Sequence, residues 1–169
     1  ALESLLAYSR PSSPSVDVVE LGELTRVALD MRAHSLSRAR IVAEVKGSED
    51  GPYFARTRRR ELLQLLLNVL LGTESVVAGW TGAKIVVGLD RRGADVLVDV
   101  TALGTPAASP SDGPTREFGL ELQRRVMARL ALGMGGVLQG DLSAEGGPMW
   151  SLTLPAHEGT SRSTMPAVP

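Results

Sequence analysis

The chain has 169 residues, a length that suits a single domain. Hydrophobic residues make up 43% of it and aromatic residues only 4%, which predicts a core built mainly from Leu, Val and Ala and excludes disorder along the whole length. The 18 Lys and Arg residues against 19 Asp and Glu residues leave a formal net charge of -1, which argues against nucleic-acid binding by counterion release.

The first fifteen residues predict the end of a helix followed by a linker. Residues 1–10 (ALESLLAYSR) place Leu2, Leu5 and Leu6 on one face of a helix. Residues 11–15 (PSSPS) end that helix, because proline cannot continue the hydrogen-bond ladder. A helix that starts at the first residue without a cap indicates the end of a longer helix, so we expect the chain to be part of a longer protein.

Residues 16–155 predict one domain of strands and helices. Hydrophobic periodicity and turn residues predict, in chain order, a strand at 16–20, a helix at 21–36, strands at 40–46 and 53–55, a buried helix from about 57, a hairpin of strands 84–90 and 95–100, a loop at 105–115, a helix from about 117 to 132, and a closing hairpin of strands 137–142 and 149–154. Residues 156–169 predict a disordered tail. This order indicates an α+β fold, a two-layer sandwich in which three helices cover one face of a mixed, mostly antiparallel sheet.

Several kinds of chemistry lack the residues that they need. The chain has no cysteine, which excludes disulfides, thiolate zinc sites and cysteine nucleophiles. We expect His34 and His157, which both lie in polar surroundings, to be solvated, so histidine-based metal sites and hydrolytic triads have little to draw on. The most apolar stretch, residues 62–71, is about half the roughly 20 residues that a bilayer-spanning helix needs, so no membrane contact is expected.

Four stretches follow one another in a characteristic order: LLAYSRP at 5–11, RRRELLQLLLNVLLGTES at 58–75, KIVVGLDRRGADVLVDV at 84–100 and FGLELQRRVMARLALGMGG at 118–136. They resemble the end of the dimerisation helix, the asparagine box, the hairpin before the first glycine box and the second glycine box of sensor histidine kinases. The chain thus resembles the catalytic, ATP-binding domain of that family, within the ATPase superfamily that includes gyrase. The resemblance implies a cytoplasmic two-component signalling protein that forms a homodimer through the upstream helix, with a response regulator or another kinase as partner.

The asparagine box of this family usually has two Asn four residues apart, so that both carboxamides face the nucleotide phosphates and Mg²⁺. Here the first is Asn68 and the second position is Gly72, which has no side chain to ligate a cation. Asn68 is therefore the candidate metal ligand if Mg²⁺ binds. The alternative for both residues is structural: Asn68 hydrogen-bonds a neighbouring strand end, and Gly72 permits close packing of its helix.

The first glycine box of the family supplies an Asp that accepts a hydrogen bond from the adenine amino group. If Gly104 is aligned with the family's glycine, Val100 takes the Asp position, and a slip of one residue puts Thr101 there. Neither has a carboxylate, and losing a charge-assisted contact weakens binding by roughly 1.5–3 kcal/mol. Asp99 takes that role only in a shifted register.

The second glycine box usually places several glycine N–H groups at a helix N-terminus, where they cradle the phosphates. The corresponding residues 115–120 (TREFGL) keep only Gly119. Glu117 puts a carboxylate where a phosphate sits in the family, and Phe118 adds bulk. Arg124 and its neighbour could meet an acidic partner or a phosphate, or could simply be solvated.

These departures favour a degenerate catalytic domain, a pseudokinase that acts mainly by protein contacts and for which we expect no cofactor. The alternative is an active ATP-dependent histidine kinase that binds ATP and Mg²⁺ through a divergent site, with Asn68, Gly104 and Gly119 as the remnant nucleotide-binding residues. A third interpretation is a scaffold that dimerises through residues 1–10. No catalytic residue is assigned, because neither histidine lies in a dimerisation helix, where the phosphoacceptor of the family stands.

Overall fold

The computed structural model describes residues 16–47, 49–106, 114–140 and 149–158, without the side chains of residues 114–120. The predicted helix end at 1–10, the linker at 11–15 and most of the predicted tail lie outside the described residues. In the described part of the chain, no helix is both long enough and apolar enough to traverse a bilayer.

The described elements follow the predicted order. They are β1 (Asp17–Glu20), α2 (Leu21–Arg38), β2 (Val42–Lys46), β3 (Phe54–Thr57), α3 (Arg59–Val77), β4 (Thr81–Arg92), β5 (Asp95–Thr105), α4 (Pro114–Gly133), β6 (Val137–Gly140) and β7 (Trp150–Pro155). The central hairpin is longer than predicted, because β4 already begins at Thr81 and β5 continues to Thr105, into the predicted loop. Pairing between the two strands continues to these ends, where Thr81 lies opposite Thr105.

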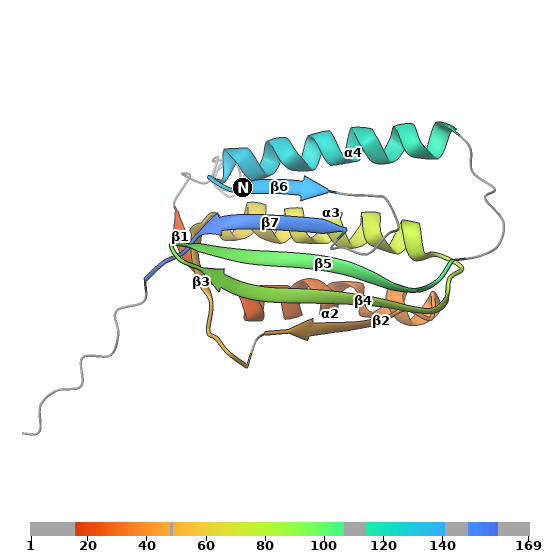
Figure 1. The fold of residues 1–169 in the computed structure, drawn as a ribbon, viewed down its shortest axis with the longest axis horizontal. Helices are drawn as coiled ribbons and strands as arrows, with labels where there is room; N and C mark the ends of the chain where they lie inside the picture. Colours follow the sequence, from red (N-terminus) through yellow and green to blue (C-terminus); the bar gives the residue numbers. More distant parts are fainter. Residues whose placement is uncertain (1–15, 48, 107–113, 141–148, 159–169) are drawn as a thin grey trace, which may run out of the picture.

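Five strands form one mixed sheet in the order β2-β4-β5-β7-β6 (Figure 1). β2 pairs with β4 in parallel, and the other three pairings are antiparallel. The prediction of a single sheet is wrong in one respect, since β1 and β3 form a separate antiparallel pair. Each of these strands leads at once into a helix, β1 into α2 and β3 into α3, which keeps them beside the helix starts. A bridge from Ala55 to Ala156 joins this pair to the end of β7, so ordered pairing extends just past the predicted domain end.

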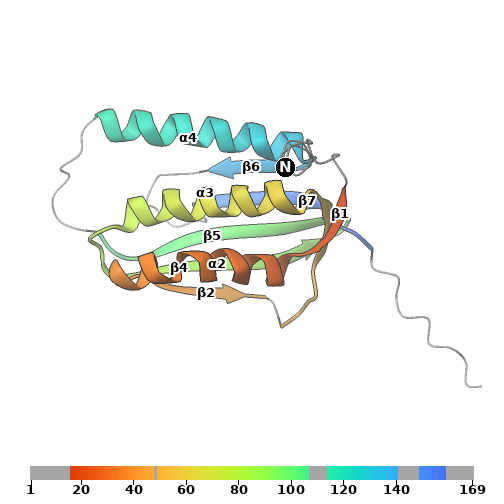
Figure 2. The same ribbon diagram turned by 180° about the vertical axis from the view of Figure 1, so that it is seen from behind.

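The helices form the second layer. α2 and α3 lie side by side on one face of the sheet, and α4 runs along β6 at the sheet edge (Figures 1 and 2). The α+β architecture of three helices on a mixed sheet is therefore confirmed. The C-terminal ends of α3 and β5 and the N-terminal end of α4 lie at one end of the molecule, on the right in Figure 1.

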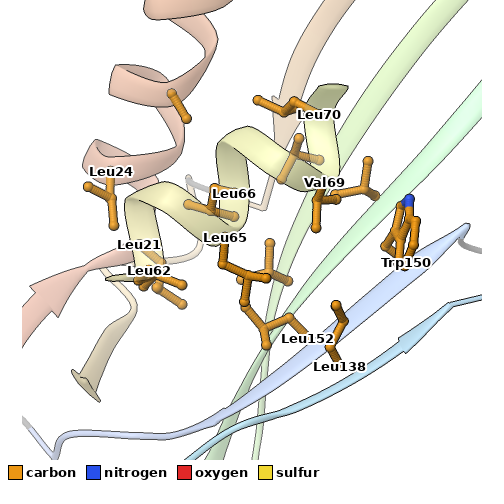
Figure 3. Close-up of a cluster of buried hydrophobic side chains, with 14 of the residues drawn as sticks. Leu21, Leu24, Leu62, Leu65, Leu66, Val69, Leu70, Leu138, Trp150 and Leu152 are labelled. Carbon is orange, nitrogen blue, oxygen red and sulfur yellow. The ribbon is translucent and has the colours of Figure 1, made fainter. Parts of the chain in front are cut away.

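The centre of the core comes from α3, as its apolar sequence predicts. Its buried side chains, drawn in Figure 3, are those of Leu62, Leu65, Leu66, Val69 and Leu70. They belong to one cluster with Trp150 of β7, whose side chain is 1% exposed. Burial of each such Leu contributes about 1.5–3 kcal/mol, so the core fixes the position of α3 and of the polar residues that it carries.

Candidate nucleotide site

Asn68 and Gly72 lie one helical turn apart on α3, and both contact Gln123 of α4. Gly72 is buried, and a Cβ atom built on it would lie 3.5 Å from Oε1 and 3.6 Å from Nε2 of Gln123. The Nε2 group of Gln123 also donates a long hydrogen bond of 3.5 Å to the main-chain oxygen of Asn68. A carboxamide from α4 therefore lies against the glycine that stands in place of the second asparagine.

Gln123 was not among the residues singled out from the sequence. It lies 55 residues from Asn68 in the chain, and only the packing of α4 against α3 brings the two together. The sequence could have indicated its orientation, because Gln123 precedes the buried Met127 by four residues and so lies on the same inward face of the helix.

Gly104 lies near the end of β5, and the backbone geometry there gives a structural reason for a glycine. Its φ is +136°, and a Cβ atom there would lie 3.1 Å from the main-chain oxygen of Thr81 and 3.2 Å from Cα of Ala83. The pairing of β4 and β5 shifts register between Thr81 and Lys84, which accounts for this close approach. The strand geometry therefore requires glycine here without reference to a nucleotide.

The two aligned adenine-binding positions lie next to each other on β5. Val100 is buried on the face that packs against the helices, and Thr101 is half-buried. Asp99 points to the opposite face of the sheet, because side chains alternate along a strand and Val100 and Val98 are both in the core. There Asp99 Oδ1 accepts a hydrogen bond of 2.5 Å from Ser151 Oγ. Its carboxylate therefore faces away from α3 and α4.

The start of α4 differs from the prediction. The helix begins at Pro114 rather than near Glu117, which makes Gly119 its sixth residue. Proline favours the first helical position, because its fixed φ suits the helix and its missing N–H would be unpaired there anyway. Only the first four N–H groups of a helix lack an intrahelical acceptor, so Gly119 lies beyond the groups that a helix N-terminus offers to an anion. The side chains of Glu117 and Phe118 lie outside the described residues.

The arginine pair on α4 is engaged by a carboxylate of the same helix. Glu121 accepts a hydrogen bond of 2.8 Å from Arg124 Nη2 and one of 3.2 Å from Arg125 Nε. The hydrogen bond from Arg124 is the main cause that lowers the pKa of Glu121, and it raises the pKa of Arg124 in turn. These guanidinium groups thus have an anionic partner within their own helix, a surface arrangement that contributes little to stability.

Metal ligands are scarce among the described side chains. No group of three or more His, Asp or Glu residues in the described part of the chain is placed to hold a metal ion. Mg²⁺ in proteins is usually held through one or two carboxylates together with the substrate phosphates. Asn68, near the middle of α3, and Gln123 of α4 have carboxamides instead.

No protein-family model and no curated protein matches this chain. Solved structures do share its fold. The catalytic domain of histidine kinase ThkA in a nucleotide-free form has a TM-score of 0.61 at 18% identity, covering 83% of this chain and 95% of that one. The mycobacterial sensor histidine kinase MprB has a TM-score of 0.54 at 20% identity, covering 85% and 99%. ThkA in complex with the response regulator protein TrrA has a TM-score of 0.57 at 18% identity, covering 92% and 46%. The predicted resemblance is therefore confirmed at the level of fold, which is that of histidine kinase catalytic domains.

Proposed function

We propose that this chain is a histidine kinase-type domain of a two-component system with a degenerate nucleotide site, and that it acts in signal transduction mainly by protein contacts. The fold supports the first part, since it is the fold of histidine kinase catalytic domains. The partners that we propose are the upstream dimerisation helix, a second copy in the full-length protein, and a response regulator or another kinase. ThkA, which has the same fold, forms a complex with a response regulator. The location that we propose is the cytoplasm.

The contact between Gly72 and Gln123 is the main observation that supports a degenerate site. An Mg²⁺ ligand is missing from Gly72, and the carboxamide of Gln123 lies within 3.5–3.7 Å of the position where a side chain at Gly72 would begin. A side chain at Gly72 would therefore begin in van der Waals contact with Gln123 of α4. Asn68 remains as a single carboxamide on α3.

The adenine end of the site supports the same proposal. Val100 places an apolar side chain in the core at the position where the family has its carboxylate. Asp99, the nearest acid in the chain, faces the other side of the sheet and bonds Ser151. The described residues therefore fit Mg²⁺ and ATP poorly, and we assign no phosphoryl-transfer step to this chain.

Calorimetric titration with ATP and with ADP, each with and without Mg²⁺, tests the proposal. We expect no heat of binding at micromolar nucleotide. The matched control is Asn68→Ala, which removes the one asparagine-box carboxamide and should change nothing if the site is inactive. Micromolar binding that Asn68→Ala weakens would overturn the proposal.

The second candidate is an active kinase domain with a divergent site, and one observation favours it. Gln123 donates from its carboxamide to the main-chain oxygen of Asn68 and lies beside Gly72, so a carboxamide from α4 lies next to the position of the second asparagine of the box. In that case Gln123→Ala should lower Mg²⁺-dependent ATP affinity by tenfold or more. Equally weak ATP affinity in the wild type and in Gln123→Ala would exclude this alternative.

A further inference from the structure

The strand β2 is an edge of the main sheet, and its outer side is open. Among the described strands it pairs only with β4, whereas the opposite edge, β6, has α4 running along it (Figures 1 and 2). The unpaired N–H and C=O groups of an edge strand are a template for another strand. Val42, the first residue of β2, is 61% exposed and adds an apolar side chain to this edge.

A hollow of about 570 Å³ lies beside the start of this edge, between α2 and β2. Its apolar lining comes from Leu29, Ala33 and Leu36 of α2 and from Ile41 and Val42 at the start of the strand. An apolar hollow beside an open strand edge is the arrangement with which proteins bind an added strand, since the main chain supplies hydrogen bonds and the hollow takes side chains.

Arg40, at the turn between α2 and β2, has a backbone conformation that favours glycine. Its φ is +56°, and its N–H donates a hydrogen bond of 3.1 Å to the main-chain oxygen of Ser37. Glycine is the usual residue at such a helix end, because it has no Cβ atom to be strained. The Arg40 side chain lines the hollow, and no ion pair engages it within the described residues. A strained residue with an unpaired charge indicates that its side chain has a use.

We propose that the edge of β2 binds a second copy of this chain, as an antiparallel strand pair with its two-fold axis at Val42. In this register Val42 lies opposite Val42 of the second copy, and Arg40 lies opposite Glu44. The same patch serves both copies, as in any two-fold dimer, and the five-stranded sheet continues from one copy into the other. This contact involves neither the nucleotide-site residues nor the upstream helix, so it goes beyond the proposed function and does not depend on it.

Charge favours this register over its neighbours. An axis at Glu44 would place the two Glu44 carboxylates opposite each other. An axis at Ala43 would place Arg40 opposite Lys46 of the second copy. Like charges that lie directly opposite destabilise an antiparallel pair, whereas opposite charges stabilise it. The axis at Val42 gives two pairs of Arg40 with Glu44, one on each side of the axis.

The apolar residues favour the axis at Val42 over an axis at Val45. An axis at Val45 would pair Glu44 with Lys46 of the second copy, but it would move Val42 and the hollow away from the centre of the contact. Ala43 and Val45 pack toward the core, so Val42 points to the open face of the sheet. With the axis at Val42 the two exposed valines face each other there, and the two hollows meet beside the axis. This register therefore removes the most apolar surface from water.

Symmetric disulfide trapping tests the register in the full chain, which has no cysteine of its own. Opposite residues of an antiparallel pair have Cα atoms about 4.5–5.5 Å apart, a distance that a disulfide can bridge. Val42→Cys is oxidised with copper phenanthroline, and so is the control Lys46→Cys, an exposed position about 13 Å further along the same strand. We expect covalent dimers to form at least tenfold faster in Val42→Cys. Equal rates would overturn the proposal.

Sedimentation equilibrium measures the dimer without a thiol. Arg40→Glu puts like charges opposite each other and should raise the dimer Kd at least tenfold, and the charge swap Arg40→Glu/Glu44→Arg should restore most of the affinity. Arg26→Glu is the control, because it changes the net charge equally at an exposed arginine in the first half of α2. It should keep the wild-type Kd. A wild-type chain that stays monomeric at near-millimolar concentration, or a dimer that Arg40→Glu does not weaken, would overturn the proposal.

Arg40→Gly separates a role in the contact from a role in the fold. Glycine relieves the strain of the positive φ, so the melting temperature of dilute, monomeric protein should rise. The same variant removes the guanidinium group and should raise the dimer Kd about tenfold. A more stable chain that dimerises less well is the expected result, and an unchanged dimer Kd would contradict the proposal.

Discussion

The contact between Gly72 and Gln123 makes a quantitative prediction about substitutions at a buried helical glycine. A Cβ atom at Gly72 meets the Gln123 carboxamide at 3.5–3.7 Å, which is ordinary van der Waals contact. Gly72→Ala therefore fits without strain and gains the helix propensity of alanine, worth about 1 kcal/mol. We expect the free energy of unfolding to rise by up to that amount, and the melting temperature to rise by roughly 2–4 °C for a chain of this size.

Gly72→Asn reverses the sign, because its side chain continues past Cβ toward atoms that are already in contact. Overpacking of this kind costs about 1–3 kcal/mol. Gln123→Ala removes the carboxamide and should restore most of the free energy of unfolding that Gly72→Asn loses. The double-mutant cycle of Gly72→Asn and Gln123→Ala should then give a coupling energy of about 1–2 kcal/mol.

Urea denaturation followed by circular dichroism provides the four free energies of this cycle. Gln64→Ala is the matched control for Gln123→Ala, since Gln64 is an exposed glutamine on α3 and should show no coupling to Gly72→Asn. If Gly72→Asn is as stable as Gly72→Ala, or if the coupling to Gln123 is zero, then the carboxamide does not fill the volume beside Gly72. The support that this contact lends to the degenerate site would then be lost.

Three further predictions concern stability. Arg32 of α2 donates two hydrogen bonds, of 3.2 and 2.6 Å, to the carboxylate of Glu74 on α3. Arg32→Ala should lower the free energy of unfolding in urea by about 1–2 kcal/mol. Arg32→Lys should restore only part of that loss, because lysine cannot form the two-pronged contact. The hydrogen bond from Lys84 is the main cause that lowers the pKa of Glu44. The stabilisation of the fold by this carboxylate is therefore present above the ordinary pKa of 4.5 and is lost as pH falls through the lower pKa of the folded state. Glu44→Gln should reduce the fall of the urea midpoint in acid, and an unchanged fall would contradict this. A Cβ atom on Gly136 would lie 2.8 Å from a main-chain oxygen of β7, so Gly136→Ala should cost about 1–3 kcal/mol in thermal unfolding, with Gly133→Ala, which meets no neighbour, as the control.

The sequence predicted those parts of the fold that depend on local periodicity. The stripe of leucines in residues 62–70 predicted a buried helix, and the alternation on both sides of residues 91–94 predicted the hairpin of β4 and β5. Both signals come from residues that are neighbours in the chain. The separate pairing of β1 with β3 joins Asp17 to Thr57, and no local pattern specifies which distant strand a short edge strand selects.

The candidate site was only partly predictable for a related reason. Asn68 and Gly72 could be identified, because one motif contains both. The packing partner of Gly72 is on another helix, and the requirement for glycine at Gly104 comes from the main chain of β4. The face of Asp99 depends on strand register, and a slip of one residue would have turned it toward the helices. Tertiary contacts, rather than residue types, thus determine what these positions can do.

The position of α4 connects the degenerate nucleotide site with a groove that lies between the start of α3 and the second half of α4. Gln123 contacts α3 beside Gly72, while the adjacent Leu122 faces the groove, because successive side chains of a helix point about 100° apart. A rigid-body shift of α4 must therefore alter both contacts together. Any partner that fills the groove and moves α4 changes the packing at Gly72 without contacting it. Because both regions share α4, a partner that binds in the groove and shifts this helix would change the packing at Gly72 through protein contacts alone, with no nucleotide required.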